Sequence, residues 1–228
     1  MKEKEIDYIQ WIDNLTDEVM KLMYSKKIIE YIEELFIQNP KLGKAGELFW
    51  YYAHYNFNSN ILVQIARLVD AKKFDDDYSL LVFLNSIKKE KYISYQNYLS
   101  VFKNNEANFP DELAKIKFEN LTGQSINDKC FNNKIDNAIK KLSDIQKKVK
   151  ILRHKRIAHL TNYDLTKPEN YIPTYQDIDE FIVAIKHIVD YCSILIANKE
   201  YVYDVQINFD EIFNPALMEN KAINKEIT

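Results

Sequence analysis

The sequence predicts an all-α fold, and two observations carry this prediction. The first is the scarcity of glycine: the chain has 228 residues but only 3 Gly and 5 Pro, whereas glycine usually makes up about 7% of a chain. Because glycine supplies the positive-φ turns and bulges of β-structure, such a chain is poorly suited to a sandwich, a barrel or a glycine-loop nucleotide fold. The second is the recurrence of apolar residues at spacings of three and four, which is typical of amphipathic helices.

The first half of the chain is expected to form two long helices followed by shorter ones. Regularly spaced apolar residues predict a helix over about 5–37, which Asn39-Pro40 ends because the residue before proline avoids the helical region. The second long helix, over about 47–71, is rich in aromatic residues and apolar on much of its surface, so we expect it to lie centrally. Shorter helices are expected over 79–87, over 92–105 and after Pro110, which opens a helix at the position that proline tolerates best.

The second half is expected to contain two more long helices, each preceded by a loop. A loop over about 120–128 precedes a helix over about 132–160, and a loop over about 162–173 precedes a helix that ends near 198. The first of these helices has a bundle-like apolar seam, with members that alternate at spacings of three and four: Ile135, Ala138, Leu142, Ile145, Val149 and Leu152.

The last long helix carries a start signal, and the chain beyond it is less regular. Thr174 is followed three residues later by Asp177, which resembles a capping box. Residues 201–209 alternate in part, which leaves a short strand and an extended tail as alternatives. We therefore expect one helical domain over 1–228, with its core at about 5–198 and a C-terminal extension over 199–228.

Composition excludes several classes of protein. Cys130 and Cys192 are too few for a disulfide framework and lack the spacing of a zinc site. The chain starts Lys-Glu-Lys-Glu after Met1 rather than with an apolar signal region, and no apolar run approaches the ~18 residues of a membrane span. The acidic residues form no compact cluster with metal-ligand spacing. We expect a cytoplasmic protein that needs no membrane, metal or cofactor.

Positive charge is concentrated in residues 129–156, although the net charge of the whole chain is −3. Ten Lys or Arg and two acidic residues lie between Lys129 and Arg156. One alternative is an ordinary solvated helix face; the other is a stripe that binds a polyanion such as RNA. In the second case the candidate RNA-binding residues are Lys147, Lys148, Lys150 and Lys155.

Arginine is rare in this chain, which has 28 Lys and only 3 Arg: Arg67, Arg153 and Arg156. An arginine in so lysine-rich a chain is more often needed for its planar, bidentate fork than for charge alone. Two of the three stand beside histidines in the segment LRHKRIAHL at 152–160. Arg67, with Asp70, is expected to form structural pairs or caps.

The apolar seam of the predicted helix over 132–160, which carries most of these basic residues, can be continued by seven positions beyond Val149 and Leu152. This places Arg156 and His159 where apolar residues are expected. Three explanations remain open: both residues are solvated beyond the core, His159 is a hydrogen-bonded core histidine, or the two line a cleft. Arginine and histidine together suit phosphodiester chemistry, because a guanidinium holds a phosphate and an imidazole transfers protons near neutral pH. A ribose 2′-hydroxyl can itself be the nucleophile in such a reaction.

These features resemble the HEPN domain, and within it the abortive-infection (phage-defence) group. The resemblance rests on an arginine, a polar residue and a histidine six positions after the arginine, at the end of a helix. Further resemblance lies in QIARLVD at 64–70, YSLLVFLNSI at 78–87 and KVKILRHKRIAHL at 148–160. It covers about 10–198 and implies a bundle of long antiparallel helices.

The resemblance assigns roles to the motif residues. Arg153 matches the motif arginine, His154 its polar neighbour and His159 the motif histidine, while Arg156 is an additional cation. In active members two motifs meet across a homodimer and form a composite ribonuclease site. Arg153 and His159 are therefore the candidate catalytic residues, and His154 and Arg156 the supporting ones.

Two functions of different classes follow. The first is a metal-independent endoribonuclease of toxin or phage-defence type, which cleaves single-stranded RNA by 2′-hydroxyl attack. The alternative is an inactive HEPN dimer that binds RNA or a protein partner, such as an antitoxin or another component of a defence system. A third interpretation is a HEPN partner of a nucleotidyltransferase, but this chain contains no transferase motif.

Overall fold

The computed structural model describes residues 7–38, 47–71, 79–106, 109–123, 133–152 and 174–203. Within these ranges it contains seven helices and no strand, which confirms the all-α fold. The helices are α1 (Tyr8–Gln38), α3 (Glu47–Leu68), α4 (Leu80–Lys89), α5 (Tyr95–Asn105), α6 (Asp111–Thr122), α7 (Asn133–Leu152) and α8 (Tyr175–Ala197). None of the helices in the described ranges combines the length and apolar character needed to cross a membrane.

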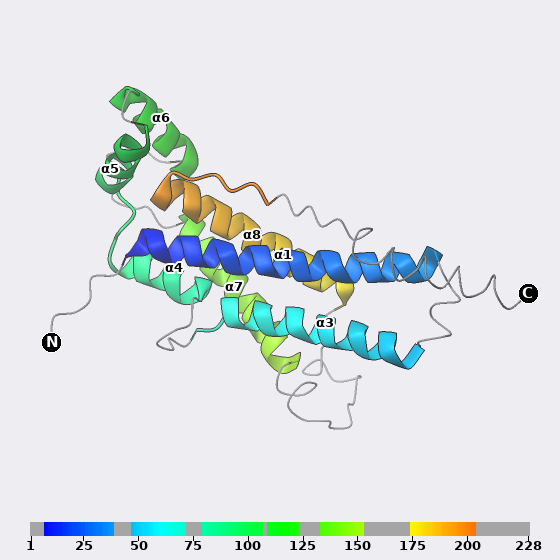
Figure 1. Ribbon diagram of the computed structural model, residues 1–228. Helices are drawn as coiled ribbons and strands as arrows, with labels where there is room; N and C mark the ends of the chain where they lie inside the picture. The colour runs from blue at the N-terminus through cyan, green and yellow to red at the C-terminus, as the bar shows by residue number, and fades with distance from the viewer. Residues whose placement is uncertain are drawn as a thin grey trace, which may run out of the picture.

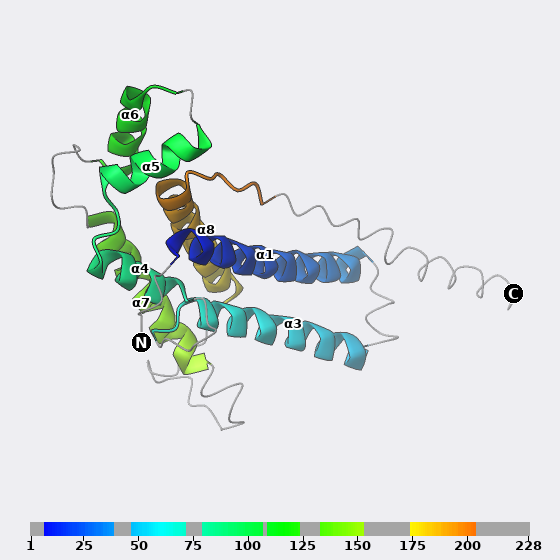
Figure 2. The ribbon, with the colours of Figure 1, turned by 60° about the vertical axis from the view of Figure 1, so that its left-hand side comes forward.

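The four long helices form the body of the molecule (Figure 1). α1 packs against both α3 and α8, and each of these two runs antiparallel to it. α7 contacts α3, α4 and α8, while α5 and α6 pair with each other and pack on α8. The short helices α5 and α6 lie at the end of the bundle where α8 finishes, far from the start of α8 (Figures 1 and 2).

The predicted apolar stripes form one continuous core. Ile12, Leu15, Val19 and Leu22 of α1 are completely buried. The predicted seam of α7 is confirmed for five of its six members, with Ala138 packed against the core and four others buried: Ile135, Leu142, Ile145 and Val149. The side chain of the sixth, Leu152, lies outside the described part of the structure. α8 contributes the broadest buried face, which places it at the centre of the bundle.

Local capping explains most of the helix boundaries. The Ser79 and Ser94 hydroxyls accept hydrogen bonds from backbone N–H groups in the first turns of α4 and α5. Pro110 was predicted to be the first residue of a helix, but α6 begins at Asp111 and Pro110 is its N-cap residue. The prediction of a loop from residue 120 was wrong over 120–122, because α6 continues to Thr122. The helix stops at its C-cap residue Gly123, whose φ of 70° is a left-handed conformation that suits glycine.

The expectation that the aromatic helix over 47–71 would lie centrally is correct only for its second half. Ile61, Ile65 and Leu68 are buried, whereas Leu48 is 70% exposed and Tyr52 is 55% exposed. The reason is geometric: the end of α1 and the start of α3 extend together past the start of α8, so fewer helices cover them (Figures 1 and 2).

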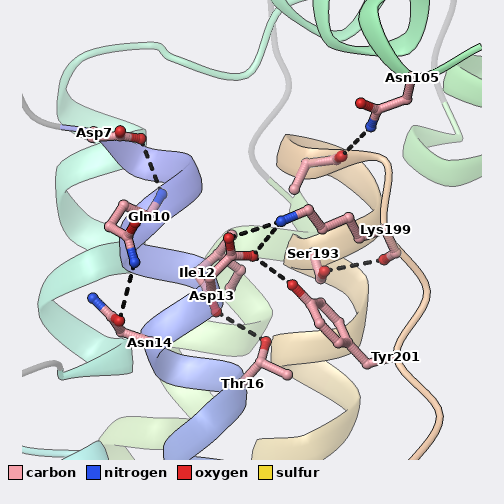
Figure 3. Close-up of polar contacts among 11 residues, drawn as sticks. Asp7, Gln10, Ile12, Asp13, Asn14, Thr16, Asn105, Ser193, Lys199 and Tyr201 are labelled. Atoms are coloured by element: carbon pink, nitrogen blue, oxygen red, sulfur yellow. Dashed lines mark hydrogen bonds and ion pairs between the residues drawn. The ribbon is translucent and has the colours of Figure 1, made fainter.

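The chain after α8 returns along α1 and is tied to it by polar contacts (Figure 3). Lys199 Nζ lies 2.8 Å from both carboxylate oxygens of Asp13, and the Tyr201 hydroxyl donates to the same carboxylate. Residues 201–203 form no strand, and the rest of the predicted extended segment lies outside the described residues, as does the loop over 162–173.

Candidate functional site

The motif residues themselves lie outside the described part of the chain: Arg153, His154, Lys155, Arg156 and His159. The structure describes the two flanks of this stretch. α7 ends at Leu152, directly before Arg153, and α8 begins after its N-cap residue Thr174. The roles assigned to the motif residues stay predictions; the structure defines the two helix ends that flank the motif stretch, residues 153–173.

The two flanks of the motif stretch contact each other. Lys148 Nζ on α7 lies 3.9 Å from Asp177 Oδ1 on α8. The same ammonium group lies 5.5 Å from the centre of the Phe181 ring, a distance at which a cation is attracted to the ring face. The end of α7 and the start of α8 therefore lie together, although 21 residues, 153–173, stand between Leu152 and Thr174 in the sequence.

The start of α8 is closed by the predicted capping box. The Thr174 hydroxyl accepts from the Asp177 backbone N–H at 3.1 Å, and the Thr174 backbone N–H donates to Asp177 Oδ2 at 2.8 Å. The Asp177 carboxylate also places negative charge at the positive end of the helix dipole. Asp177 thus fixes the point at which the motif stretch enters α8.

Lysines surround the last turns of α7. Lys147, Lys148 and Lys150 are all exposed. Because successive helical residues are rotated by about 100°, these three spread over roughly 160° of the helix circumference. Lys147 lies near Asp144 at 3.3 Å, an exposed pair of the kind that contributes little to stability. The end of α7 therefore offers positive charge in several directions beside the motif.

A groove of about 570 Å³ runs between α7 and α8. Its lining mixes both signs of charge with apolar side chains: Lys141, Asp144, Ile145, Lys148, Gln176, Asp179, Glu180, Phe181 and Val183. Two of its three carboxylates pair with lysines beside the groove, Asp144 with Lys147 and Asp179 with Lys26, so the groove is a surface of mixed charge rather than a basic one.

A polar cluster at the start of α8 was not foreseen from the sequence. His54 Nε2 on α3 lies 2.8 Å from Glu33 Oε1 on α1 and 3.2 Å from the hydroxyl of Tyr175, the first residue of α8. Asn58 donates from its side-chain amide to His54 Nδ1 at 3.1 Å and to Tyr175 Oη at 3.3 Å. Because a carboxylate only accepts, Nε2 carries the proton that faces Glu33.

The sequence contains one weak signal of this cluster. His54 and Asn58 stand four positions apart, so they share one face of α3. The partners on that face come from other helices, at separations of 21 residues for Glu33 and 121 for Tyr175. Sequence spacing alone does not pair residues so far apart.

The prediction that Arg67 is structural agrees with its contacts. Arg67 Nη1 lies 4.0 Å from Glu18 Oε2 on α1, and the Asp70 backbone carbonyl accepts from the Ser79 hydroxyl. Both contacts join neighbouring elements. Within the described ranges, no three His, Cys, Asp or Glu side chains stand close enough together to hold a metal ion.

Comparison with protein-family models identifies the class of protein that this helical bundle represents. The model HEPN_AbiU2, described as AbiU2, matches residues 9–212. The chain belongs to the AbiU2 family of HEPN abortive-infection proteins, which are phage-defence proteins. No curated protein and no solved structure matches the chain.

Proposed function

We propose that this protein is a metal-independent endoribonuclease of toxin or phage-defence type. Arg153 and His159 are its catalytic residues, and His154 and Arg156 support them. Lys147, Lys148, Lys150 and Lys155 bind the RNA backbone. The observation that carries the proposal is that a chain of the HEPN abortive-infection class has the arginine and histidine of the motif six positions apart.

The surroundings of the motif support this assignment. The exposed lysines at the end of α7 lead directly into Arg153, so phosphates held along α7 would approach the proposed site. The contact between Lys148 and Asp177 holds the two flanks of the motif stretch together.

The proposed reaction is a transesterification within the RNA. The 2′-oxygen attacks the adjacent phosphorus, and the bond from phosphorus to the 5′-oxygen breaks. A base removes the 2′-hydroxyl proton and an acid donates a proton to the leaving 5′-oxygen, which yields a 2′,3′-cyclic phosphate and a free 5′-hydroxyl. His159 transfers protons, and the Arg153 guanidinium stabilises the charge on the phosphate oxygens.

We propose that two copies of the chain share this site as a homodimer. One arginine and one histidine are too few to hold a phosphate and move two protons, so a second motif completes the set. The single helical domain of 1–228 acts in the cytoplasm, where RNA is its substrate and an antitoxin or another defence component is its regulator. Light scattering should give twice the chain mass of 27.1 kDa; a monomer at micromolar concentration would contradict the composite site.

The deciding experiment is RNA degradation by the purified protein in EDTA. Wild-type protein should cleave single-stranded RNA, His159→Ala should abolish cleavage, and Arg153→Lys should also fail because a point charge does not replace a bidentate fork. Arg156→Lys should be milder. The rate should fall on both sides of neutral pH if imidazoles supply both base and acid.

A matched control separates chemistry from folding. His187 is an exposed histidine on α8, so His187→Ala removes the same side chain away from the motif and should keep full activity. Melting temperatures are measured for all variants. If His159 were a buried structural residue, its loss would cost roughly 1–3 kcal/mol of stability. A lowered melting temperature with full activity of the folded fraction would contradict the catalytic role.

A further inference from the structure

Tyr175 is an exposed aromatic residue at the first position of α8. Its surface is 57% exposed. It stands two residues before Asp177, which contacts Lys148 at the end of the basic helix. Residues two apart on a helix face different sides, so Tyr175 contacts α3 while Asp177 contacts α7, both from the first turn of α8.

The ring is exposed but held in place. Its hydroxyl lies 3.2 Å from His54 Nε2 and 3.3 Å from Asn58 Nδ2. The Tyr175 and His54 rings lie 5.9 Å apart between centroids, with their planes at 59°. Glu33 in turn holds the imidazole through a contact of 2.8 Å. Contacts from α1 and α3 thus fix the orientation of a side chain that begins α8.

A ring fixed in this way is suited to stacking on a flat ligand. An exposed side chain that is already ordered loses little rotamer freedom when a ligand covers it. Unpaired bases of single-stranded RNA stack on tyrosine rings while their phosphates contact lysines, and both kinds of group are present at this junction. Phe109 offers a contrast, because its ring is 51% exposed but has no hydroxyl to anchor it.

We propose that Tyr175 is a preorganised stacking platform for an unpaired base of the bound RNA, held by His54, Asn58 and Glu33. This rests on the proposed function only in that RNA is the ligand; it does not require that the RNA be cleaved. Tyr175 is a binding residue, and His54, Asn58 and Glu33 are positioning residues that act through it.

The test measures binding of a short single-stranded 2′-O-methyl RNA that carries the fluorescent base 2-aminopurine. This probe lacks a 2′-hydroxyl nucleophile, so cleavage does not disturb the measurement. Wild-type protein should bind it and quench the fluorescence by stacking. Tyr175→Leu should weaken binding about 5- to 150-fold, since stacking on an aromatic side chain contributes about 1–3 kcal/mol per base.

Further variants separate the ring from its anchors. Tyr175→Trp should keep tight binding and quenching. Tyr175→Phe and His54→Gln keep a ring but remove its anchor, so both should weaken binding by a few fold. The matched control Phe109→Leu should bind as wild type does. The salt dependence should be the same in all variants, because stacking releases no counterions.

Several results would overturn the proposal. These are wild-type affinity in Tyr175→Leu, an equal loss in Phe109→Leu, and a failure of wild-type protein to bind the probe. If Tyr175→Leu does not fold, as judged by circular dichroism, unaltered binding by both Tyr175→Phe and His54→Gln would overturn it instead. Tyr175-dependent binding without any RNA cleavage in EDTA would support the platform and contradict the ribonuclease.

Discussion

At the scale of single residues, the Asp177 carboxylate joins the start of α8 to the end of α7. One oxygen accepts from the Thr174 backbone N–H at 2.8 Å, and the other lies 3.9 Å from Lys148 Nζ. The carboxylate is therefore both a helix cap and a contact between the flanks of the motif stretch. Its neighbour Tyr175 makes a second junction, with His54 on α3.

Asp177→Ala should lower the free energy of unfolding by about 0.5–1 kcal/mol, because it removes half of the capping box and a charge that favours the helix dipole. Urea unfolding measures this. Glu180→Ala is the control, since Glu180 is exposed on the same helix and its replacement removes the same charge. It should change stability by less than about 0.5 kcal/mol. Equal losses in the two variants would show that general charge, not capping, is responsible.

At the scale of elements, α7 has two different long sides. Its seam of Ile135, Leu142, Ile145 and Val149 is buried, while its described lysines stand mainly on the exposed surface. The flank that faces α8 is partly neutralised by the acidic side chains of the groove. Lys147, Lys148 and Lys150, near the C-terminal end of α7, are exposed and are the lysines of this helix proposed to bind RNA.

Replacing Lys147, Lys148 and Lys150 with Gln should flatten the salt dependence of RNA affinity. A phosphate that no lysine neutralises keeps its counterion, so the slope of log affinity against log salt should fall by about 0.7 for each such phosphate of a single strand. Binding titrations at several salt concentrations measure the slope. A control triple, Lys21, Lys89 and Lys103 to Gln, makes the same change of charge on other exposed surfaces.

An unchanged slope in the first triple variant would show that these lysines form an ordinary solvated face. An equal change in the control triple would show that RNA responds to net charge alone. Only a change confined to the α7 variant supports a binding stripe at this end of the helix.

At the scale of the whole molecule, the core holds protonated groups that resist ionisation. Burial raises the pKa of the Cys192 thiol to about 12. Burial, together with the nearby Glu106, raises the pKa of Tyr98 to about 12. Burial is also the main cause of the raised pKa values of Tyr8, Tyr191 and Tyr203. Packing of the native bundle therefore depends on these groups staying neutral.

This predicts a loss of stability in alkaline solution. In the unfolded chain tyrosines ionise near pH 10 and cysteines at about 8.5, whereas the native state keeps these protons. The unfolded state then binds fewer protons, so the free energy of unfolding decreases as pH rises. The free energy of unfolding should be constant below about pH 8 and fall from about pH 8.5, where the unfolded-state thiol begins to ionise, to about pH 12, the pKa of Cys192 and Tyr98 in the native state. Urea unfolding across this range, with tyrosinate absorbance recorded in parallel, tests it.

The share of the absorbance that comes from the buried tyrosines should rise together with the loss of helical circular dichroism, because these tyrosines ionise only when the bundle opens. Full ionisation of the tyrosines near pH 10 with unchanged helicity would contradict the prediction. A flat stability between pH 7 and 8 is the internal control.

Much of the fold follows from local sequence patterns. The stripes of α1, α7 and α8, the capping box at Thr174 and the start of α4 at Ser79 were all predicted, because helix periodicity and capping depend on residues within a few positions of each other. Two of the errors are local as well. α6 continues past 120 to Thr122, with Gly123 as its C-cap, and Pro110 precedes its helix rather than lying within the first turn.

The sequence by itself determined the helical class, the basic character of α7 and the Arg153–His159 motif, since composition and short spacing define them. Only the tertiary structure decided that the first half of α3 is incompletely covered, that Lys148 meets Asp177, and that His54 joins Glu33 to Tyr175 across 21 and 121 residues. The physical reason is that helix periodicity defines which face of a helix is apolar, whereas the crossing of packed helices determines which polar side chains at their edges come into contact.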